Sequence, residues 1–489
     1  MFTGSGVADK RGHSPHRRRR GVRGAGCCGA ARVLARGHFR RGARVRDVMV
    51  AQRVTATLMT VAVVSLTLVP APPAAAVTPP TVDDAYLPPA APPAPPHPTE
   101  QRRPCFDNRG RDDDETRSLS PALEPVWRLT RGRGQVVAVI DTGVARHRWL
   151  PRLVGGGDYV SNGDGTADCD GHGTIVAGII GGAATPDGFS GVAPEATILA
   201  IRQSSNRFAD DAGGSGVGDV GTLAKAVRTA ADLGATVINI SSVACVDADP
   251  DTDTADAGFD DRPLGAALAY AVDVKNVVVV AAAGNVGAGQ CRHQNPLDAP
   301  GWDDVQSVTS PGWYDDLVLC VGSVAADGTA SSFSLAGPWV DIAAPGEQVV
   351  SLHPDGDGLI ASLGADKPIS GTSYAAPFVA GVAALVRSRF PHLSAREVMR
   401  RIEATAVRPP RGWDAAVGSG VVDPLAAVSG DAPALAPPAR NTAMVAPPAP
   451  SPEDTGPRRI AFGGGALCVA VALATVMLSR RGRQGITGD

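Results

Sequence analysis

The sequence predicts an α/β fold of three layers, in which a mainly parallel sheet carries helices on both faces, plus a C-terminal transmembrane helix. Between residues 121 and 429, short apolar runs alternate with stretches of helical spacing, a rhythm typical of sheets covered by helices. The predicted strands are apolar throughout, as expected where both faces of a parallel sheet are buried. A separate uncharged run of 19 residues, 460–478, is about as long as a helix that crosses a bilayer.

The chain opens with two segments that we do not expect to join the folded body. Residues 1–53 carry 14 Lys and Arg against 2 Asp and Glu, a net charge of +12. They lack periodicity and are predicted to be a basic disordered segment, with Met49 as an alternative start. Residues 54–76 place a short apolar run before small residues, which is the pattern of a secretory signal peptide. A membrane anchor is the alternative, but the run is short for one.

Pro-rich stretches flank the predicted body. Residues 77–120 form an N-terminal extension and residues 430–457 a semi-rigid linker. We expect residues 458–479 to form the transmembrane helix and the basic residues 480–489 a cytoplasmic tail. A buried core helix is the alternative for the last apolar run, but no globular sequence follows to bury it. The prediction is a single-pass protein of the cell membrane whose body, residues 121–429, lies outside the cytoplasm.

Within the body, each predicted element follows from the spacing of its apolar residues. The helix predicted from Ser373 to Phe390 is the strongest, and small residues in its first turns allow close packing in the interior. Ser394 and Glu397 form a capping-box pattern that opens another helix. The remaining strands are expected at 136–140, 196–201, 236–240 and 276–281, and the remaining helices at 220–233 and 264–274.

Five cysteines fall in the segments expected outside the cytoplasm, and an odd number leaves one unpaired. Cys320 lies in the apolar run 317–321 and is predicted to be a buried free thiol. The other four lie in polar, loop-like sequence, where disulfides are expected outside the cytoplasm. The sequence alone does not fix their pairing; we favour Cys105 with Cys169 and Cys245 with Cys291.

Three motifs far apart in the chain carry an acid, a base and a nucleophile. Asp141 ends a predicted strand, His172 lies between two glycines, and Ser373 begins the long helix. A serine hydroxyl needs a base within hydrogen-bond reach, and the base needs an orienting group. Taken alone, each has a structural explanation: a turn for the aspartate, a surface position for the histidine and helix capping for the serine. Together, in the order Asp, His, Ser, they favour hydrolysis by acyl transfer.

An oxyanion site is the fourth part of such a mechanism. Asn285 follows the predicted strand 276–281 and offers a side-chain amide donor. The alternative explanation for this asparagine is a structural one, a residue in a left-handed turn. The backbone N–H of Ser373, at a helix start, is expected to be a second donor.

On these motifs the body resembles the subtilisin family of serine proteases, the subtilases, over residues 135–429. The resemblance implies a subtilisin-like fold and serine endopeptidase activity. It also assigns the family's acid, base, oxyanion amide and nucleophile to Asp141, His172, Asn285 and Ser373.

A further strand resembles the one that pairs with the substrate peptide in this family. The resemblance implies that Ser241, Ser242 and Val243 bind the polypeptide substrate. The family usually has glycines where Ser242 and Val243 stand, which leaves the shape of the adjoining pocket open.

The order of segments narrows the resemblance to the mycosins, membrane-anchored proteases of the actinobacterial type VII secretion system. It spans about residues 55–485. It implies that the extension wraps around the domain and that the protein associates with the type VII membrane complex and processes its substrates. The alternative function is a scaffold subunit of that complex with dispensable proteolysis. A degradative exoprotease is a third candidate function, and the predicted membrane anchor argues against it.

Composition and motifs argue against other classes of function. Removing the +12 of residues 1–53 from the whole-chain −3 leaves −15 for residues 54–489, and an acidic body argues against nucleic-acid binding. No His-Glu-x-x-His zinc pattern occurs, and we expect no metal and no cofactor. The Asp-rich stretches 112–114 and 247–261 are interpreted as solvated loops in preference to calcium sites.

Overall fold

The computed structural model describes residues 77–107, 120–210, 216–248, 260–298, 301–364 and 367–430. The basic leader, the signal peptide, the transmembrane helix, the tail and all but the first residue of the linker lie outside these ranges. They stay predictions. Within the described ranges, no helix is both long and apolar enough to cross a bilayer.

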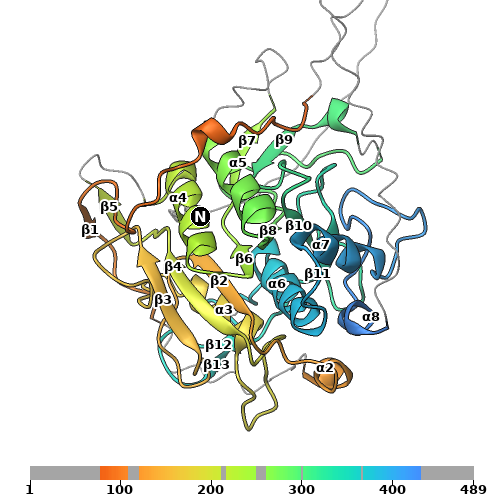
Figure 1. Ribbon diagram of the computed structural model, residues 1–489, viewed down its shortest axis with the longest axis horizontal. Coiled ribbons are helices and arrows are strands. Elements are labelled where there is room, and N and C mark those ends of the chain that lie inside the picture. The colour runs from red at the N-terminus through yellow and green to blue at the C-terminus, as the bar shows by residue number, and fades with distance from the viewer. Residues whose placement is uncertain are drawn as a thin grey trace, which may run out of the picture. The chain divides into compact units, whose positions relative to one another are not determined.

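A seven-stranded parallel sheet forms the centre of the fold (Figure 1). Three of its central strands are buried at every residue, which explains why their sequences are apolar without alternation. In spatial order the strands are β11 (Ile342–Pro345), β10 (Leu319–Val324), β8 (Val278–Ala282), β6 (Val237–Ile240), β2 (Val136–Asp141), β4 (Thr197–Arg202) and β3 (Leu153–Asp158).

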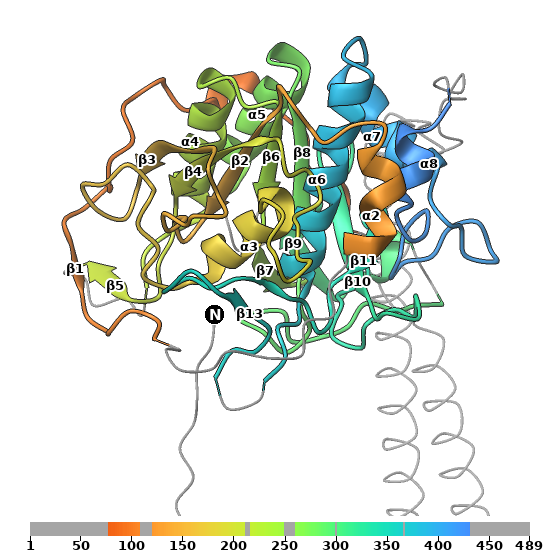
Figure 2. The ribbon, with the colours of Figure 1, turned by 90° about the horizontal axis from the view of Figure 1, so that it is seen from below.

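Helices cover both faces of this sheet (Figure 2). On one face α3 (His172–Gly181) packs against α6 (Thr372–Arg389), and on the other α4 (Val220–Asp232) packs against α5 (Arg262–Ala269). α5 continues as a π-helical turn, η3 (Tyr270–Val274), so the helix predicted at 264–274 has two parts. The α/β prediction is confirmed.

The remaining elements are short. The capping box predicted at Ser394 and Glu397 is present at the start of α7. Three antiparallel pairs join β1 to β5, β7 to β9 and β12 to β13. These strands are β1 (Thr99–Gln101), β5 (Phe208–Asp210), β7 (Ala244–Asp247), β9 (Ser307–Ser310), β12 (Ser351–Leu352) and β13 (Leu359–Ile360). The helical elements are η1 (Asp84–Tyr86), α2 (Ser120–Trp127), η4 (Trp302–Asp304), α7 (Ala395–Ala404) and α8 (Pro424–Val428).

α6 runs through the interior because its sequence is rich in small residues. Fourteen of its 18 residues are buried, so it must be packed nearly all round. A Cβ on Gly381 would lie 2.6 Å from the Cβ of Val192; glycine is needed there for the close approach. The helix begins at Thr372, which puts Ser373 in its first turn.

The N-terminal extension lies against the body and is held at several points. β1 pairs with β5, and the guanidinium of Arg228 donates to the carbonyl of Pro88 at 3.0 Å. Within the extension, Cys105 forms a disulfide with Cys169, in the loop before α3. A second disulfide joins Cys245 to Cys291. Both favoured pairings are therefore present, and Cys320 is a buried free thiol.

One acidic residue departs from the predicted solvated loop at 247–261. Asp261, the residue before α5, is 4 % exposed. Its carboxylate accepts hydrogen bonds from Ser310, Trp313 and Tyr314 at 2.7, 2.7 and 2.9 Å. Burial raises the pKa of Asp261, and these three donors oppose the rise. The donors lie about 50 residues away in sequence, so a local pattern of acidic residues does not reveal them. Residues 112–114 and 249–259 lie outside the described ranges.

Candidate active site

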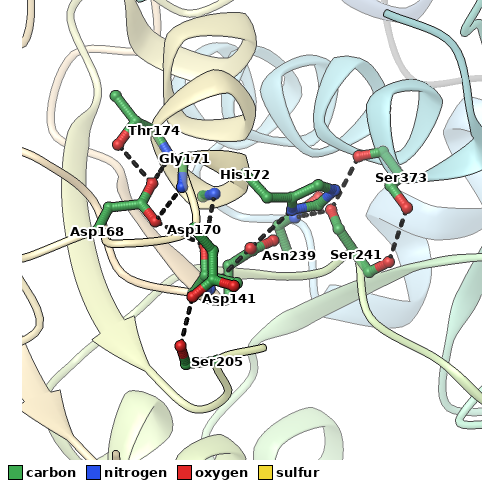
Figure 3. A network of polar contacts seen from close by, with 12 residues as sticks. Asp141, Asp168, Asp170, Gly171, His172, Thr174, Ser205, Asn239, Ser241 and Ser373 are labelled. Carbon is green, nitrogen blue, oxygen red and sulfur yellow. Dashed lines mark hydrogen bonds and ion pairs between the residues drawn. The ribbon is translucent and has the colours of Figure 1, made fainter. Parts of the chain in front are cut away.

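Asp141 and His172 form a hydrogen-bonded pair at the carboxyl end of the sheet. Asp141 is the last residue of β2 and is fully buried. Its Oδ1 lies 2.7 Å from Nδ1 of His172, the first residue of α3 (Figure 3). The backbone N–H of Thr142 donates to the same oxygen at 2.7 Å. Because a carboxylate only accepts, the neutral imidazole carries its proton on Nδ1, and Nε2 is left to accept.

The surroundings of His172 favour its charged form. Burial lowers the pKa of the imidazole, but the charge and hydrogen bond of Asp141 and the charge of Asp168 outweigh it, so the pKa is raised. The side chain still has 28 % of its surface exposed. Part of the side chain is therefore accessible to a substrate.

Ser373 lies beside this pair, in the first turn of α6. In Figure 3 the imidazole of His172 lies between Asp141 and Ser373. The ring of the next residue, Tyr374, has its centroid 5.2 Å from that of His172. The Ser373 hydroxyl donates to the carbonyl of Ser241 at 3.1 Å, and the Ser241 hydroxyl donates to the carbonyl of Ser373 at 3.0 Å. The hydroxyl therefore has a backbone partner in this structure.

Asn285 faces the start of the same helix. Its Oδ1 accepts from the backbone N–H of Thr372 at 3.0 Å and from the Thr372 hydroxyl at 3.2 Å. Since the carbonyl end of the amide is engaged, the NH₂ end is the one left to donate. A Cβ on Gly371 would lie 3.5 Å from that nitrogen, which places the amide beside the residues that precede Ser373.

The predicted substrate segment Ser241–Val243 follows β6 and lies next to Ser373. Ser241 is buried, while Ser242 and Val243 are half-buried. A Cβ built on Gly284, the residue before Asn285, would lie 3.5 Å from the Val243 Cγ2 methyl and 3.5 Å from the Cys291 sulfur. Val243 and the second disulfide thus lie beside the backbone next to the candidate oxyanion site.

Sequence reasoning missed Asp168, whose carboxylate binds the loop around His172. Oδ1 accepts from the backbone N–H of Gly171, and Oδ2 accepts from the backbone N–H and hydroxyl of Thr174 (Figure 3). An aspartate four residues before the start of an apolar helical stretch was the available signal, because carboxylates commonly accept from helix N-termini. In the described part of the chain, no three or more His, Cys, Asp or Glu side chains are grouped as metal ligands.

Known proteins share both the sequence and the fold of this chain. The family model described as "Subtilase family" matches residues 132–420. Mycosin-4 of Mycobacterium tuberculosis (strain ATCC 25618 / H37Rv) is 55 % identical over 466 residues, which are 90 % of this chain and 100 % of that protein.

Two solved structures extend the likeness to the fold. The MycP3 protease from the type VII (ESX-3) secretion system matches with a TM-score of 0.65 and 46 % identity, over 73 % of this chain and 100 % of that one. A chain of the periplasmic assembly from the ESX-5 inner membrane complex matches with a TM-score of 0.67 and 42 % identity, over 77 % of this chain and 100 % of that one.

Proposed function

Because this chain belongs to the subtilase family of serine proteases and, within it, to the mycosins, we propose that it is a membrane-anchored endopeptidase. It acts outside the cytoplasm on polypeptides handled by a type VII secretion complex. The observation that carries the chemistry is the 2.7 Å bond between Asp141 and His172 beside the start of α6. That pair is what a serine hydroxyl needs in order to become a nucleophile.

In the proposed reaction, the Ser373 hydroxyl turns from the Ser241 carbonyl toward Nε2 of His172. It attacks the scissile carbonyl carbon while His172 takes its proton, and Asp141 stabilises the imidazolium that forms. His172 then gives the proton to the leaving amine. Water then attacks the acyl carbon while His172 takes its proton; the bond from the acyl carbon to Ser373 Oγ breaks, the product acid leaves, and His172 returns the proton to the serine oxygen. The 2.7 Å hydrogen bond between Asp141 and His172 supports this role of Asp141, because the bond holds the imidazole in the tautomer that accepts at Nε2.

The oxyanion of each tetrahedral intermediate is proposed to bind two donors. One is the amide NH₂ of Asn285, whose direction is fixed by the bonds of its Oδ1 to Thr372. The other is the backbone N–H of Ser373, at the positive end of α6. Donors held in place before the reaction stabilise developing charge without reorganising.

Location and partners are proposed from the relatives and the disulfides. A homologous chain belongs to the periplasmic assembly of the ESX-5 inner membrane complex, and two disulfides suit an oxidising compartment. We propose that Ser241, Ser242 and Val243 bind the extended substrate backbone, and that the predicted helix at 458–479 anchors the protein.

A fluorophosphonate probe tests the activity without any knowledge of the substrate. The full-length protein should be labelled at Ser373, identified by peptide mass spectrometry, and the Ser373→Ala variant should not be labelled. His172→Ala should slow labelling by several orders of magnitude. Absence of labelling at Ser373 in the folded wild-type protein would refute the proposal.

The scaffold function remains the second candidate, because homologues are built into the ESX-5 inner membrane complex. Cells that carry only Ser373→Ala separate the two. If secretion continues and only cleavage of a client stops, the body has a structural role of its own. If secretion stops while the complex stays assembled, proteolysis is the essential function.

A further inference from the structure

Asp168 joins the segment that carries the proposed acid to the one that carries the proposed base. Its carboxylate accepts four hydrogen bonds. Oδ1 accepts from the Thr142 hydroxyl and the Gly171 backbone N–H, both at 2.8 Å. Oδ2 accepts from the Thr174 backbone N–H at 2.8 Å and the Thr174 hydroxyl at 2.6 Å. The residue is half-buried, and its carboxylate end is the part enclosed by these donors.

Each donor adjoins a proposed catalytic residue. Thr142 directly follows Asp141, and its hydroxyl accepts from the Gly173 backbone N–H at 3.0 Å. Gly171 precedes His172, and Thr174 lies two residues beyond it. One carboxylate therefore ties the end of β2 to both sides of the histidine.

The backbone that follows His172 packs closely against the segment that carries Asp141. A Cβ on Gly173 would overlap the carbonyl oxygen of Gly143 and lie 3.1 Å from the Cβ of Asp141. The direction of the imidazole thus depends on how the loop before α3 is held.

We propose that Asp168 is a positioning residue of the protease: its carboxylate fixes the backbone around His172 so that the ring keeps its bond to Asp141 and presents Nε2 to Ser373. This inference rests on the proposed function and adds a residue to it. Asp168 touches neither the substrate nor the reacting atoms, so it acts through His172.

The charge of Asp168 adds a second effect, on the titration of the base. Among the described residues, the titratable groups that face the imidazole are Asp141 from β2, Asp168 from the preceding loop and Tyr374 from α6. Burial raises the pKa of Tyr374 well above its ordinary value, so that phenol stays neutral. Burial also raises the pKa of Asp168 to about 6, against the lowering effect of its hydrogen bonds. The charge of the ionised Asp168 raises the pKa of His172.

The test is the rate of fluorophosphonate labelling of Ser373 in the full-length protein, followed from pH 5 to pH 9. In Asp168→Asn, an NH₂ group replaces one of the two acceptor oxygens and the negative charge is removed. We expect labelling at pH 8 to slow by roughly 10- to 100-fold, as for a misplaced catalytic group. We also expect the acid limb to move down by about half a pH unit, because a nearby negative charge is lost.

Two further variants separate positioning from general stability. Asp164→Asn removes an exposed charge of the same loop, whose partners are Thr166 and Arg146, and should label within 2-fold of wild type. Thr142→Val removes the bond to Asp168 together with the acceptor of the Gly173 N–H and should slow labelling, while Thr142→Ser, which keeps the hydroxyl, should label at the wild-type rate.

The outcomes separate this inference from the proposed function. If the wild-type protein is not labelled at Ser373, the protease function itself fails. If the wild type is labelled and Asp168→Asn shows the same rate and acid limb, Asp168 is not a positioning residue. Two results together would assign Asp168 to stability alone and overturn the proposal. Asp168→Asn would label more slowly with an unmoved acid limb, and Thr142→Ser would label as slowly as Thr142→Val. If Asp168→Asn does not fold, the two Thr142 variants test the proposal instead: equal labelling rates of Thr142→Val and Thr142→Ser would overturn it.

Discussion

The disulfide between Cys105 and Cys169 fastens the N-terminal extension to the loop that precedes the candidate base. Replacing both cysteines by serine removes the link without leaving a reactive thiol. The rest of the extension keeps its own contacts, among them the pairing of β1 with β5 and the bond from the Phe106 N–H to the Cys169 carbonyl at 2.8 Å. We therefore expect the double variant to fold with the extension in place.

The size of the effect follows from the length of chain that the bond closes. The two cysteines are 64 residues apart, and closing a loop of that length in the unfolded chain costs about 4 kcal/mol of entropy at 25 °C. For a body of about 300 residues, an unfolding entropy of about 0.6 kcal/mol per kelvin converts this to a drop of about 6 °C in Tm.

Urea unfolding and calorimetry under non-reducing conditions measure this loss. The matched comparison is Cys245→Ser with Cys291→Ser, which opens a loop of 46 residues and so also costs about 4 kcal/mol by entropy. Its sulfurs are buried, so hydroxyls placed there add a desolvation cost and the loss should be larger.

Fluorophosphonate labelling of the Cys105→Ser, Cys169→Ser variant gives a second reading. Because Asp168 still holds the loop by four hydrogen bonds, the labelling rate should stay within about 3-fold of wild type. An unchanged Tm would refute the entropic argument. A labelling rate lowered by tenfold or more at an unchanged pH optimum would show that the disulfide, and not Asp168, holds the loop.

Three more predictions follow from the site and the fold. The labelling rate should fall on the acid side with a midpoint above pH 6.5, because protonated His172 cannot accept the serine proton and its pKa is raised from 6.5; a rate that stays flat down to pH 5 would contradict its role as base. Asn285→Ala should lower the rate constant for ester or peptide hydrolysis roughly 10²- to 10³-fold with little change in KM, the loss known for the oxyanion amide of subtilisin, which we adopt; a changed KM at constant kcat would instead assign Asn285 to substrate binding. Arg401→Met should lower the free energy of unfolding by about 2–5 kcal/mol, because the buried guanidinium donates to the carbonyls of Ala427 and Ser429 at 2.6 and 2.7 Å and each would lose its partner; urea titration measures this, and labelling at Ser373 should persist in the folded variant.

Patterns that are local in sequence were predicted well. The apolar runs at 136–140 and 276–281 became β2 and β8, within two residues, because a strand buried on both faces must be apolar at every position. The capping box at Ser394 and Glu397 formed because both of its bonds close within four residues. The favoured cysteine pairs are also present, although their spacing did not dictate them.

Contacts between residues distant in the chain were decided by the tertiary structure. The sequence pattern predicts that Asp261 belongs to an acidic loop, and only the folded chain brings Ser310, Trp313 and Tyr314 to its carboxylate. The partner of the Ser373 hydroxyl, the carbonyl of Ser241, is 132 residues away in sequence.

The sequence by itself determined the class of fold, the family and which residue types are available for acyl transfer, since these follow from periodicity and from short motifs. The folded chain decided how they meet: Asp141, Asn285 and the starts of α3 and α6 lie at one end of the sheet because parallel strands all finish at the same edge. It also revealed the role of Asp168. What a carboxylate can hold in place depends on which donors surround it, and these donors come from two segments that only folding brings together.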